Sequence, residues 1–329
     1  MDKRILICGL GSMGKRRLKI LKSLLPEAQI CGVDPRQDRR EEAGTQFGIP
    51  AGADFKTVFG TYTPNTVFAC GPPLTHTDIV TYSLAHGADT FSELNLNAGG
   101  YKEIVELAEK NGRTAFLSAT FLYKKEVEWI IARLENTDKI SYRYHTGQYL
   151  PDWHPWESYS DFFVANKETS AVREIMSIEF PWIIKAFGEV VDYKAMKYKM
   201  SHLDLPYDDT LHLLITHANG SVGVLSFDCV SVKPERKLEV YTDRFFFEWQ
   251  GTPGSLAEYE VGTKKMRPIQ LYEEVISDDQ YEDFIVENPY IEEIRDFFYL
   301  IRHREKKQRY DYGQDRYVLA LIDQIEMNL

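Results

Sequence analysis

The stretch RILICGLGSMG, residues 4–14, decides the fold of the first part of the chain. A run typical of a buried strand leads into glycines spaced GxGxxG, and a helical pattern follows at once. In such a unit the first glycine permits a tight turn, the second lets a pyrophosphate reach the backbone, and the third lets helix and strand pack closely. The N–H groups at the helix N-terminus then bind the phosphates. This segment therefore predicts dinucleotide contacts from Gly9, Gly11, Ser12, Met13 and Gly14.

An acidic residue, Asp34, ends the second apolar run and lies twenty residues beyond Gly14. A carboxylate at this place accepts hydrogen bonds from the adenosine ribose hydroxyls and repels a 2′-phosphate. Arg36, Arg39 and Arg40 follow closely, and their positive charge attracts a 2′-phosphate instead. We give Asp34 the greater weight, so the sequence predicts NAD as the cofactor and makes NADP the less favoured one.

Short apolar runs alternate with helical patterns over the first 120 residues. Strands connected through helices imply a parallel sheet with right-handed crossovers. The sequence therefore predicts an α/β protein with an N-terminal Rossmann domain over residues 1–120. The expected strands cover 4–8, 29–34, 52–54, 66–70, 89–92 and 114–118, and the expected helices cover 13–25, 37–47, 76–85 and 101–110.

The pattern changes after a helical stretch at 125–134, where β-branched and aromatic residues become frequent. Turn sequences at Asn219-Gly220 and Thr242-Asp243 separate neighbouring strand-like runs, which indicates hairpins. We therefore expect a C-terminal α+β domain over residues 121–329, built on a large, mostly antiparallel sheet, that holds substrate and forms oligomers. Its expected strands cover 139–144, 210–216, 221–230, 237–242 and 244–249; helices at 291–304 and 316–327 complete the chain and are allowed to pack back on the first domain.

The composition excludes several classes of partner. The chain has 329 residues with 39 Lys and Arg against 50 Asp and Glu, which gives a net charge of −11. Nucleic-acid binding needs clustered cations, so no nucleic-acid partner is expected. No apolar run reaches the length of a membrane span, so no membrane partner is expected either.

The four cysteines are far apart in the sequence and form no CxxC pair, so they do not suggest a metal site. Three of them, Cys8, Cys31 and Cys70, lie in apolar strand-like runs, and the fourth is Cys229. We interpret the three in strand-like runs as buried, reduced thiols. Reduced thiols, together with an N-terminus that runs directly into a strand, favour a cytoplasmic protein.

Two further segments follow the expected fourth and fifth strands: CGPPLTH, residues 70–76, and SELNL, residues 92–96. Together with the glycine-rich turn and the antiparallel second half, they resemble the glucose–fructose oxidoreductase/inositol dehydrogenase (Gfo/Idh/MocA) family. In that family the first loop reads roughly T-P-P-x-x-H and lies along the cofactor, while the second reads E-K-P. The resemblance implies an NAD-dependent oxidoreductase and adds cofactor contacts from Gly71, Pro72, Pro73, His76 and Glu93.

The chain departs from the family pattern where the family holds its acid–base groups. Leu94 stands in place of the lysine, and a leucine side chain cannot donate a proton or a hydrogen bond. The family's second motif, a glycine-rich segment leading to D-x-x-x-H, corresponds to residues 169–180, which lack the glycines and the histidine. Glu179 lies within one residue of the histidine's place. Other residues must therefore supply any proton transfer.

Residues 145–157, HTGQYLPDWHPWE, combine tryptophans, histidines and carboxylates in one loop, where the family places substrate contacts. Aromatic faces stack on the C–H surfaces of sugars, while Asp, His and Gln hydrogen-bond hydroxyls. The alternative is a structural loop that packs on a partner subunit, its path fixed by two prolines. The expected substrate contacts are His145, Asp152, Trp153 and Trp156, joined by Arg173; no metal site is expected, because neither ligand number nor geometry for zinc is specified.

These features predict an NAD-dependent oxidoreductase acting on a CH–OH group of a sugar derivative: an amino sugar, a nucleotide-linked sugar or a polyol. The loop at 151–154 resembles those of family members linked to bacterial surface-sugar pathways. His154, Glu179 and Tyr123 are the expected proton acceptors. Lys124 and Lys125 follow the sixth expected strand; we favour a surface position at a helix N-terminus for them, and the alternative is that one of them replaces the missing lysine. The alternative, favoured by Leu94, is a non-catalytic NAD(H)-binding sensor or scaffold with a sugar ligand.

The second-domain sheet also predicts self-association. Phe245, Phe247 and Trp249 alternate with Phe246 and Glu248, so both faces of the sheet carry aromatic area. One face packs on the domain's own helices, and an exposed aromatic face is a common interface. We therefore expect a homodimer or homotetramer that assembles through the second face.

Overall fold

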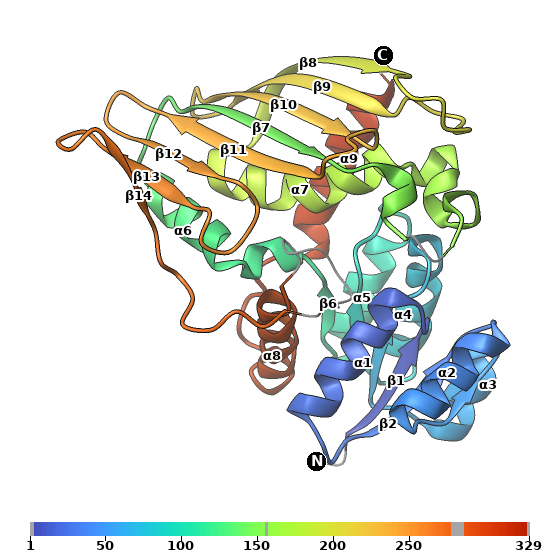
Figure 1. Ribbon diagram of the computed structural model, residues 1–329. Coiled ribbons are helices and arrows are strands. Elements are labelled where there is room, and N and C mark those ends of the chain that lie inside the picture. The colour runs from blue at the N-terminus through green and yellow to red at the C-terminus, as the bar shows by residue number, and fades with distance from the viewer. Residues whose placement is uncertain (1–2, 155–156, 278–285, 328–329) are drawn as a thin grey trace. The chain divides into compact units, whose positions relative to one another are not determined.

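The computed structural model describes residues 3–154, 157–277 and 286–327, and the chain forms two compact units (Figure 1). The first unit comprises Met1–Thr120 and Tyr290–Leu319, and the second comprises Phe121–Pro289 and Ala320–Leu329. In these described segments, no helix has the length and apolar character needed to cross a membrane.

The first unit is built on a six-stranded parallel sheet, as the sequence predicts. The strand order is β3-β2-β1-β4-β5-β6, and the order reverses direction between β1 and β4. In open α/β sheets the crevice beyond the carboxyl ends of the strands at such a reversal holds the ligand. The strands are β1 Arg4–Cys8, β2 Gln29–Val33, β3 Ala51–Gly52, β4 Thr66–Ala69, β5 Asp89–Ser92 and β6 Ala115–Leu117.

The helices of the first unit match the expected ones and add α3, which the sequence analysis missed. Helix α3 brings Phe59 into a buried cluster with Phe55 and Tyr62 at its edge, and Asp54 caps it by accepting a 2.9 Å hydrogen bond from the Thr57 N–H. The other helices are α1 Ser12–Leu24, α2 Gln37–Phe47, α4 His76–Ala85 and α5 Tyr101–Asn111; α3 itself covers Phe55–Tyr62, and α8 Asn288–Arg302 falls largely in this unit.

An eight-stranded sheet forms the second unit, in the order β14-β13-β12-β11-β7-β10-β9-β8. Strands β7 and β10 pair in parallel, and all other neighbours are antiparallel, so the predicted mostly antiparallel sheet is confirmed. The Asn219-Gly220 turn joins β9 to β10, and Thr242-Asp243 joins β11 to β12. The strands are β7 Ser141–Gly147, β8 Val190–Tyr198, β9 Thr210–His217, β10 Val222–Asp228, β11 Glu235–Tyr241, β12 Phe246–Trp249, β13 Ala257–Glu260 and β14 Lys265–Pro268.

Helices α6 Lys125–Leu134 and α7 Ala171–Phe187 lie on one face of this sheet (Figure 1). Phe247 and Trp249 point to that face and are fully buried, and the Trp182 ring of α7 lies 6.2 Å from that of Trp249. Helix α9 Tyr312–Met327 begins in the first unit and ends in the second. Short 3-10 turns complete the chain: η1 Pro73–Thr75, η2 Thr120–Tyr123, η3 Leu150–Asp152, η4 Tyr159–Asp161, η5 Phe163–Ala165 and η6 Lys167–Thr169.

Cys8, Cys31 and Cys70 are free and buried, as expected, and so is Cys229. Burial raises the pKa of the Cys8 and Cys31 thiols, and it raises the pKa of Cys229 to about 12. These thiols are therefore protonated near neutral pH and act as small apolar side chains.

Candidate functional site

The glycine-rich turn of the first unit has no space for side chains at two of its glycines. Gly9 has φ +94°, and a Cβ there would lie 2.5 Å from the Gly71 nitrogen. A Cβ on Gly14 would lie 1.9 Å from the Gly9 carbonyl oxygen. The strand, the turn and the start of α1 therefore pack as closely as a dinucleotide-binding turn requires.

Asp34 anchors this turn from the end of β2. Its Oδ2 accepts a 2.8 Å hydrogen bond from the Leu10 N–H, and its Oδ1 accepts one of 2.9 Å from the Arg36 N–H. The Arg39 guanidinium lies 3.8 Å from the same carboxylate and 3.2 Å from where a Cβ on Gly11 would be. The acidic group and one of the three competing arginines thus share one edge of the turn.

His76 connects the loops that follow β4 and β5. Its Nε2 donates to the Gly71 carbonyl at 2.8 Å, and its Nδ1 lies 3.0 Å from Asn95 Oδ1. Burial lowers the pKa of His76, so the ring is neutral at pH 7. His76 therefore fixes the relative position of these two loops, and Pro73, also buried, begins η1 between them.

Glu93 lies in a buried charge cluster that the sequence analysis did not anticipate. Arg17 of α1 donates to both oxygens of Glu93, at 2.6 and 3.2 Å, and to Glu293 of α8 at 2.7 Å. Glu293 also accepts from the hydroxyls of Ser118 and Thr120, at 3.0 and 2.9 Å. This cluster connects helix α1 to the segment that carries Leu94. The signal for it in the sequence is Arg17, an arginine on the buried side of α1.

The first unit therefore fits the nicotinamide dinucleotide that the sequence implies. Its turn excludes side chains at Gly9 and Gly14, and the first turn of α1, which holds Ser12 and Met13, contains no acidic residue to repel a phosphate. A helix N-terminus of this kind attracts anions through its N–H groups and dipole.

Glu179 of α7 lies at the centre of a buried polar cluster in the second unit. Its Oε2 accepts hydrogen bonds from the Tyr144 hydroxyl at 2.7 Å and the Trp182 indole at 2.6 Å, and its Oε1 pairs with Arg236 at 2.5 Å. The carboxylate is fully buried, and Arg236 also donates to the Tyr144 hydroxyl at 3.1 Å. With three donors in place, Glu179 mainly orients Arg236 and Tyr144.

Lys124 lies beside this cluster and is 5% exposed, not at the surface as the sequence suggested. Its ammonium lies 4.8 Å from the Phe121 ring centre and 5.7 Å from that of Trp249. Burial, together with the neighbouring charge of Arg236, lowers the pKa of Lys124 to about 8. Lysines of this kind exchange protons near neutral pH and are typical of functional sites.

The described residues of the segment 145–157 contact one another and residues outside the segment. His145 pairs with Asp228 at 2.7 Å, and His154 lies 3.0 Å from Glu157 and packs on Phe162. The Trp153 indole donates to the Gln148 carbonyl at 3.1 Å and packs against the buried cluster around Leu150. Asp152 is exposed, and Trp156 falls outside the described residues.

The remaining predicted residues lie apart from the Glu179 cluster or at its edge. Arg173 pairs with Asp323, at 2.6 Å, and with Glu326, both on α9. Tyr123 is buried in η2, directly before Lys124. Glu174, in the first turn of α7, has a buried Oε2 with no hydrogen-bond partner among the residues that the structure describes, and burial raises the pKa of Glu174 to about 8.

No group of three or more potential metal-binding side chains occurs within residues 3–154, 157–277 and 286–327.

The N-terminal part of the chain matches a known family model. Residues 3–119 match the model of the Gfo/Idh/MocA oxidoreductase family, described as an oxidoreductase family with an NAD-binding Rossmann fold. None of the curated protein sequences compared with the chain matches it.

Several solved structures share the fold of the whole chain. An oxidoreductase from Thermotoga maritima has a TM-score of 0.80 at 16% identity, covering 99% of this chain and 96% of its own. A levoglucosan dehydrogenase bound to NADH and levoglucosan has a TM-score of 0.79 at 15% identity, covering 100% and 97%. UDP-N-acetylglucosamine 3-dehydrogenase from Acidithiobacillus ferrooxidans has a TM-score of 0.76 at 14% identity, covering 100% and 98%.

The similarity to these structures concerns the fold, whereas the resemblance to the family rests on the match over residues 3–119. The glycine-rich turn and the parallel sheet at its expected order agree with that match. Over these residues the chain resembles the Gfo/Idh/MocA oxidoreductases, whose family model describes an NAD-binding Rossmann fold.

Proposed function

We propose that the chain is an NAD-dependent oxidoreductase that acts on a CH–OH group of a sugar derivative. The dinucleotide domain, proposed to span residues 1–120, binds the cofactor, and residues 121–329 bind the substrate. The observation that carries the proposal is Lys124, a buried lysine with a pKa of about 8 in the second unit. It offers the proton acceptor that Leu94 cannot provide.

Oxidation of a carbinol removes a hydride from carbon and a proton from oxygen. NAD, when bound, supplies the hydride acceptor. The neutral amine of Lys124 takes the hydroxyl proton, since a base with a pKa near the working pH is the most effective one. Arg236 supports this by holding down the pKa of Lys124, and Glu179 fixes Arg236 in place.

The three acceptors expected from the sequence keep distinct places in this proposal. His154 is partly buried, and its Nδ1 lies 3.0 Å from Glu157 Oε1. Tyr123 adjoins Lys124 along the chain, and Glu179 serves as a positioning residue because its oxygens are engaged by three donors.

A sugar derivative is the substrate class favoured by the side chains of the loop and by the relatives. His145, Asp152, Trp153 and Trp156 supply polar and aromatic groups for a polyhydroxylated ligand. The charge of Arg173, the fifth expected contact, is already matched by Asp323 and Glu326. Structures of the same fold carry the names of a levoglucosan dehydrogenase and a UDP-N-acetylglucosamine 3-dehydrogenase. We therefore propose an anhydrosugar, amino sugar, polyol or nucleotide-linked sugar, the last in keeping with bacterial surface-sugar biosynthesis.

The second candidate is a non-catalytic NAD(H)-binding sensor or scaffold that binds a sugar. Leu94, whose side chain stands in the place of the family's lysine, favours it. A sensor has no need for a buried lysine with a lowered pKa, because keeping such a charge out of water opposes folding. We therefore rank the enzyme first.

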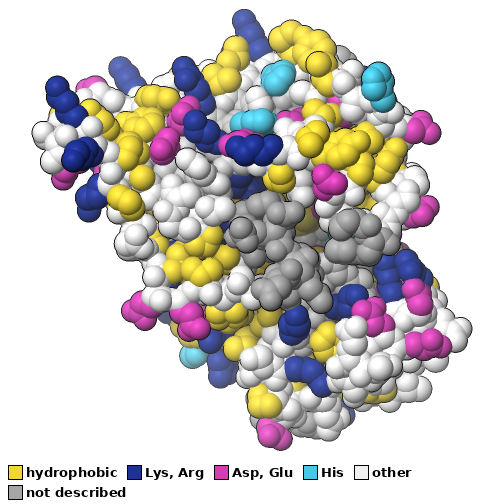
Figure 2. All heavy atoms as spheres, in the orientation of Figure 1, with side chains coloured by type: hydrophobic (Ala, Val, Ile, Leu, Met, Phe, Trp, Pro, Cys, Tyr) yellow, Lys and Arg dark blue, Asp and Glu magenta, His cyan; other side chains and the backbone are white. Residues whose placement is uncertain are grey.

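We also propose that the chain forms a homodimer or homotetramer through the face of the second sheet opposite α6 and α7. Large apolar side chains on this face are exposed: Met196 56%, Leu214 53%, Val222 47% and Val224 47%. Figure 2 shows hydrophobic side chains among basic and histidine side chains over the second unit. Contiguous exposed apolar area of this kind is typical of an interface.

A screen of NAD reduction tests the function directly. The purified chain is mixed with NAD and, one at a time, levoglucosan, inositol, UDP-N-acetylglucosamine and a UDP-linked uronic acid, and NADH absorbance is followed. We expect reduction with at least one sugar and little with NADP. The enzyme proposal is contradicted, and the sensor proposal supported, if sugars bind by calorimetry but no sugar reduces NAD. The same result must hold in reverse: the corresponding oxidised sugars accept no hydride from NADH.

A further inference from the structure

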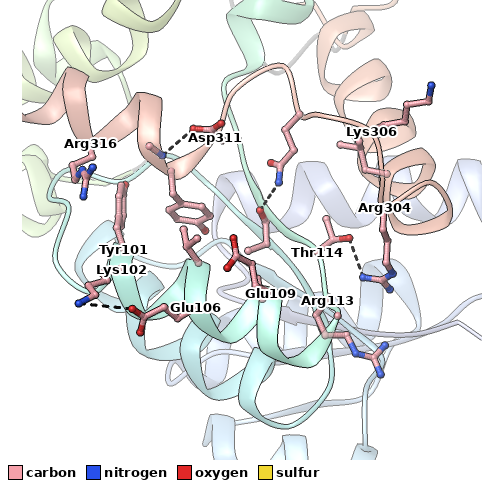
Figure 3. A pocket seen from close by; sticks show the side chains of 18 residues that line it. Tyr101, Lys102, Glu106, Glu109, Arg113, Thr114, Arg304, Lys306, Asp311 and Arg316 are labelled. Atoms are coloured by element: carbon pink, nitrogen blue, oxygen red, sulfur yellow. Dashed lines mark hydrogen bonds and ion pairs between the residues drawn. The ribbon is translucent and has the colours of Figure 1, made fainter.

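A hollow of about 710 Å³ lies on the first unit (Figure 3). Helix α5, the segment after α8 and the first turn of α9 line it. None of its lining residues belongs to the segments that the sequence assigns to the dinucleotide. Its volume is that of a small-molecule site, so this hollow has room for a second ligand.

Basic side chains outnumber acidic ones around the hollow: Lys102, Arg113, Arg304, Lys306 and Arg316 against Glu106, Glu109 and Asp311. Two of the acids are already engaged. Glu106 lies 3.8 Å from Lys102, and the Asp311 carboxylate accepts the N–H groups of Gly313 and Gln314 at 2.9 Å. The net charge of the side chains that line the hollow is therefore positive.

Two arginines are held at the N-terminal end of strand β5 by a single buried acid, Asp89. Arg304 donates to both oxygens of Asp89, at 2.9 and 3.2 Å, and Arg113 lies 3.8 Å from the same carboxylate. Lys306 and Arg316 are exposed, and within the described residues no ion pair forms at either of them. Two cations are thus fixed in place, and two are left for an incoming anion.

The wall also contains polar atoms that lack partners among the described residues. Arg113 Nε, a donor, and Gln308 Oε1, an acceptor, are both buried without a hydrogen bond. The other end of the Gln308 amide is fixed, because its Nε2 donates to the Ala115 carbonyl at 2.9 Å. Buried polar atoms without partners are rare in folded proteins, so a donor and an acceptor of this kind in one wall indicate a ligand.

Aromatic and aliphatic side chains complete the wall. The Tyr101 and Tyr312 rings meet edge to face with their centres 4.8 Å apart, and Leu300 is buried beside them. An apolar wall with a few polar groups is the usual composition of a small-molecule site.

We propose that this hollow is a second binding site, separate from the dinucleotide turn, for a small organic anion that carries a hydroxyl donor. The acid group of the ligand, a carboxylate or a phosphate, meets one of the two exposed cations of the wall, Lys306 or Arg316. Its hydroxyl donates to Gln308 Oε1, and its carbon skeleton lies on the tyrosine rings. The site does not depend on the proposed oxidoreductase activity.

Titration calorimetry on the full chain saturated with NAD tests the site, with citrate and glycerol phosphate as probes. Both carry an acid group and a hydroxyl, and ionic strength is held constant with chloride. The test variant is Lys306→Gln with Arg316→Gln. The matched control is Lys110→Gln with Lys307→Gln, which removes the same charge from exposed positions of the same region that do not line the hollow.

We expect at least one probe to bind the wild type, and the test variant to bind it at least about tenfold more weakly, a difference of about 1.4 kcal/mol. The control variant should bind as the wild type does, and NAD affinity should be equal in all three, which shows that they are folded. The proposal is overturned if neither probe binds the NAD-saturated wild type, or if the test and control variants lose affinity equally.

Discussion

Lys124 is the residue on which the proposed chemistry depends, and its burial links activity to stability. Its folded pKa, about 8, lies below the ordinary value of 10.5. The folded state therefore binds this proton less well than the unfolded state. The resulting destabilisation is absent above about pH 10.5 and is complete below about pH 8.

Replacing Lys124 with methionine should lower turnover by about a hundredfold to ten-thousandfold, the usual effect of losing an acid–base group, and leave NAD affinity unchanged. The same variant should be more stable than the wild type at pH 6 to 7, on the order of 1–3 kcal/mol, because a buried charge is removed. Steady-state kinetics and urea unfolding measure the two effects. Lys125→Met, at the exposed neighbour, is the control and should change neither. Full turnover in Lys124→Met would move the proton acceptor to His154 or Tyr123.

Cofactor preference depends on the balance between Asp34 and Arg39. We expect NAD to bind at least about tenfold more tightly than NADP, about 1.4 kcal/mol, because a 2′-phosphate would meet the Asp34 carboxylate. Arg39→Ala should widen the difference, since Arg39 lies 3.8 Å from that carboxylate. Arg36→Ala is the control, because Arg36 is exposed and already paired with Asp38 at 2.6 Å. Calorimetry with both cofactors measures this; equal affinities in the wild type would show that the arginines dominate.

Helix α7 contains an ionisable group, Glu174, with a buried oxygen that no described residue hydrogen-bonds. Burial raises the pKa of Glu174 from 4.5 to about 8. The folded state thus retains its proton longer than the unfolded state. Stability from this group is complete below about pH 4.5 and is lost as the pH rises through about 8.

Glu174→Gln should therefore raise the free energy of unfolding at pH 8, on the order of 1–3 kcal/mol, and leave it nearly unchanged at pH 4.5. Urea unfolding at the two pH values measures the difference. Glu103→Gln, on the exposed side of α5, is the control and should show no such pH dependence. A stability gain that is equal at both pH values would argue against an ionisation effect.

The elements that the sequence predicts well are those with strong local patterns. The six parallel strands and the α1, α2, α4, α5 and α6 helices follow from apolar runs and helical spacing, to within a few residues. Strands β8, β13 and β14 were missed because their residues are largely exposed or only half buried, so no apolar pattern marks them. Helix α3 was missed because it is short.

The candidate site also has a part that the sequence predicts and a part that only the structure shows. Local steric rules predict the glycine turn, and Gly9 and Gly14 fit them. Contacts between distant segments are not visible in a single sequence, such as Arg17 with Glu293 or Lys124 with Trp249. Two adjacent lysines before a helix predict a surface position, and only the fold shows that one of them is buried.

For the whole molecule, assembly is the property that the exposed sheet face predicts. Leu214 and Val224 are paired across β9 and β10 and are about half exposed. Leu214→Asp with Val224→Asp should convert the proposed dimer or tetramer into a monomer, because two carboxylates in an apolar interface lose their hydration. Light scattering at micromolar concentration measures this. Val232→Asp, 75% exposed and outside the strands, is the control. A wild type that is already monomeric would contradict the assembly.

In the proposed reaction, the chain transfers hydride from a sugar carbinol carbon to NAD. The most direct measurement is a single-turnover reaction with excess enzyme, NAD and a sugar deuterated at that carbon, followed by mass spectrometry of the nicotinamide. We expect the deuterium to appear on the nicotinamide with the wild type and Lys125→Met, and at a much lower rate with Lys124→Met. A sugar that binds the NAD-loaded chain by calorimetry, yet transfers no deuterium to the nicotinamide, would contradict the proposed hydride transfer.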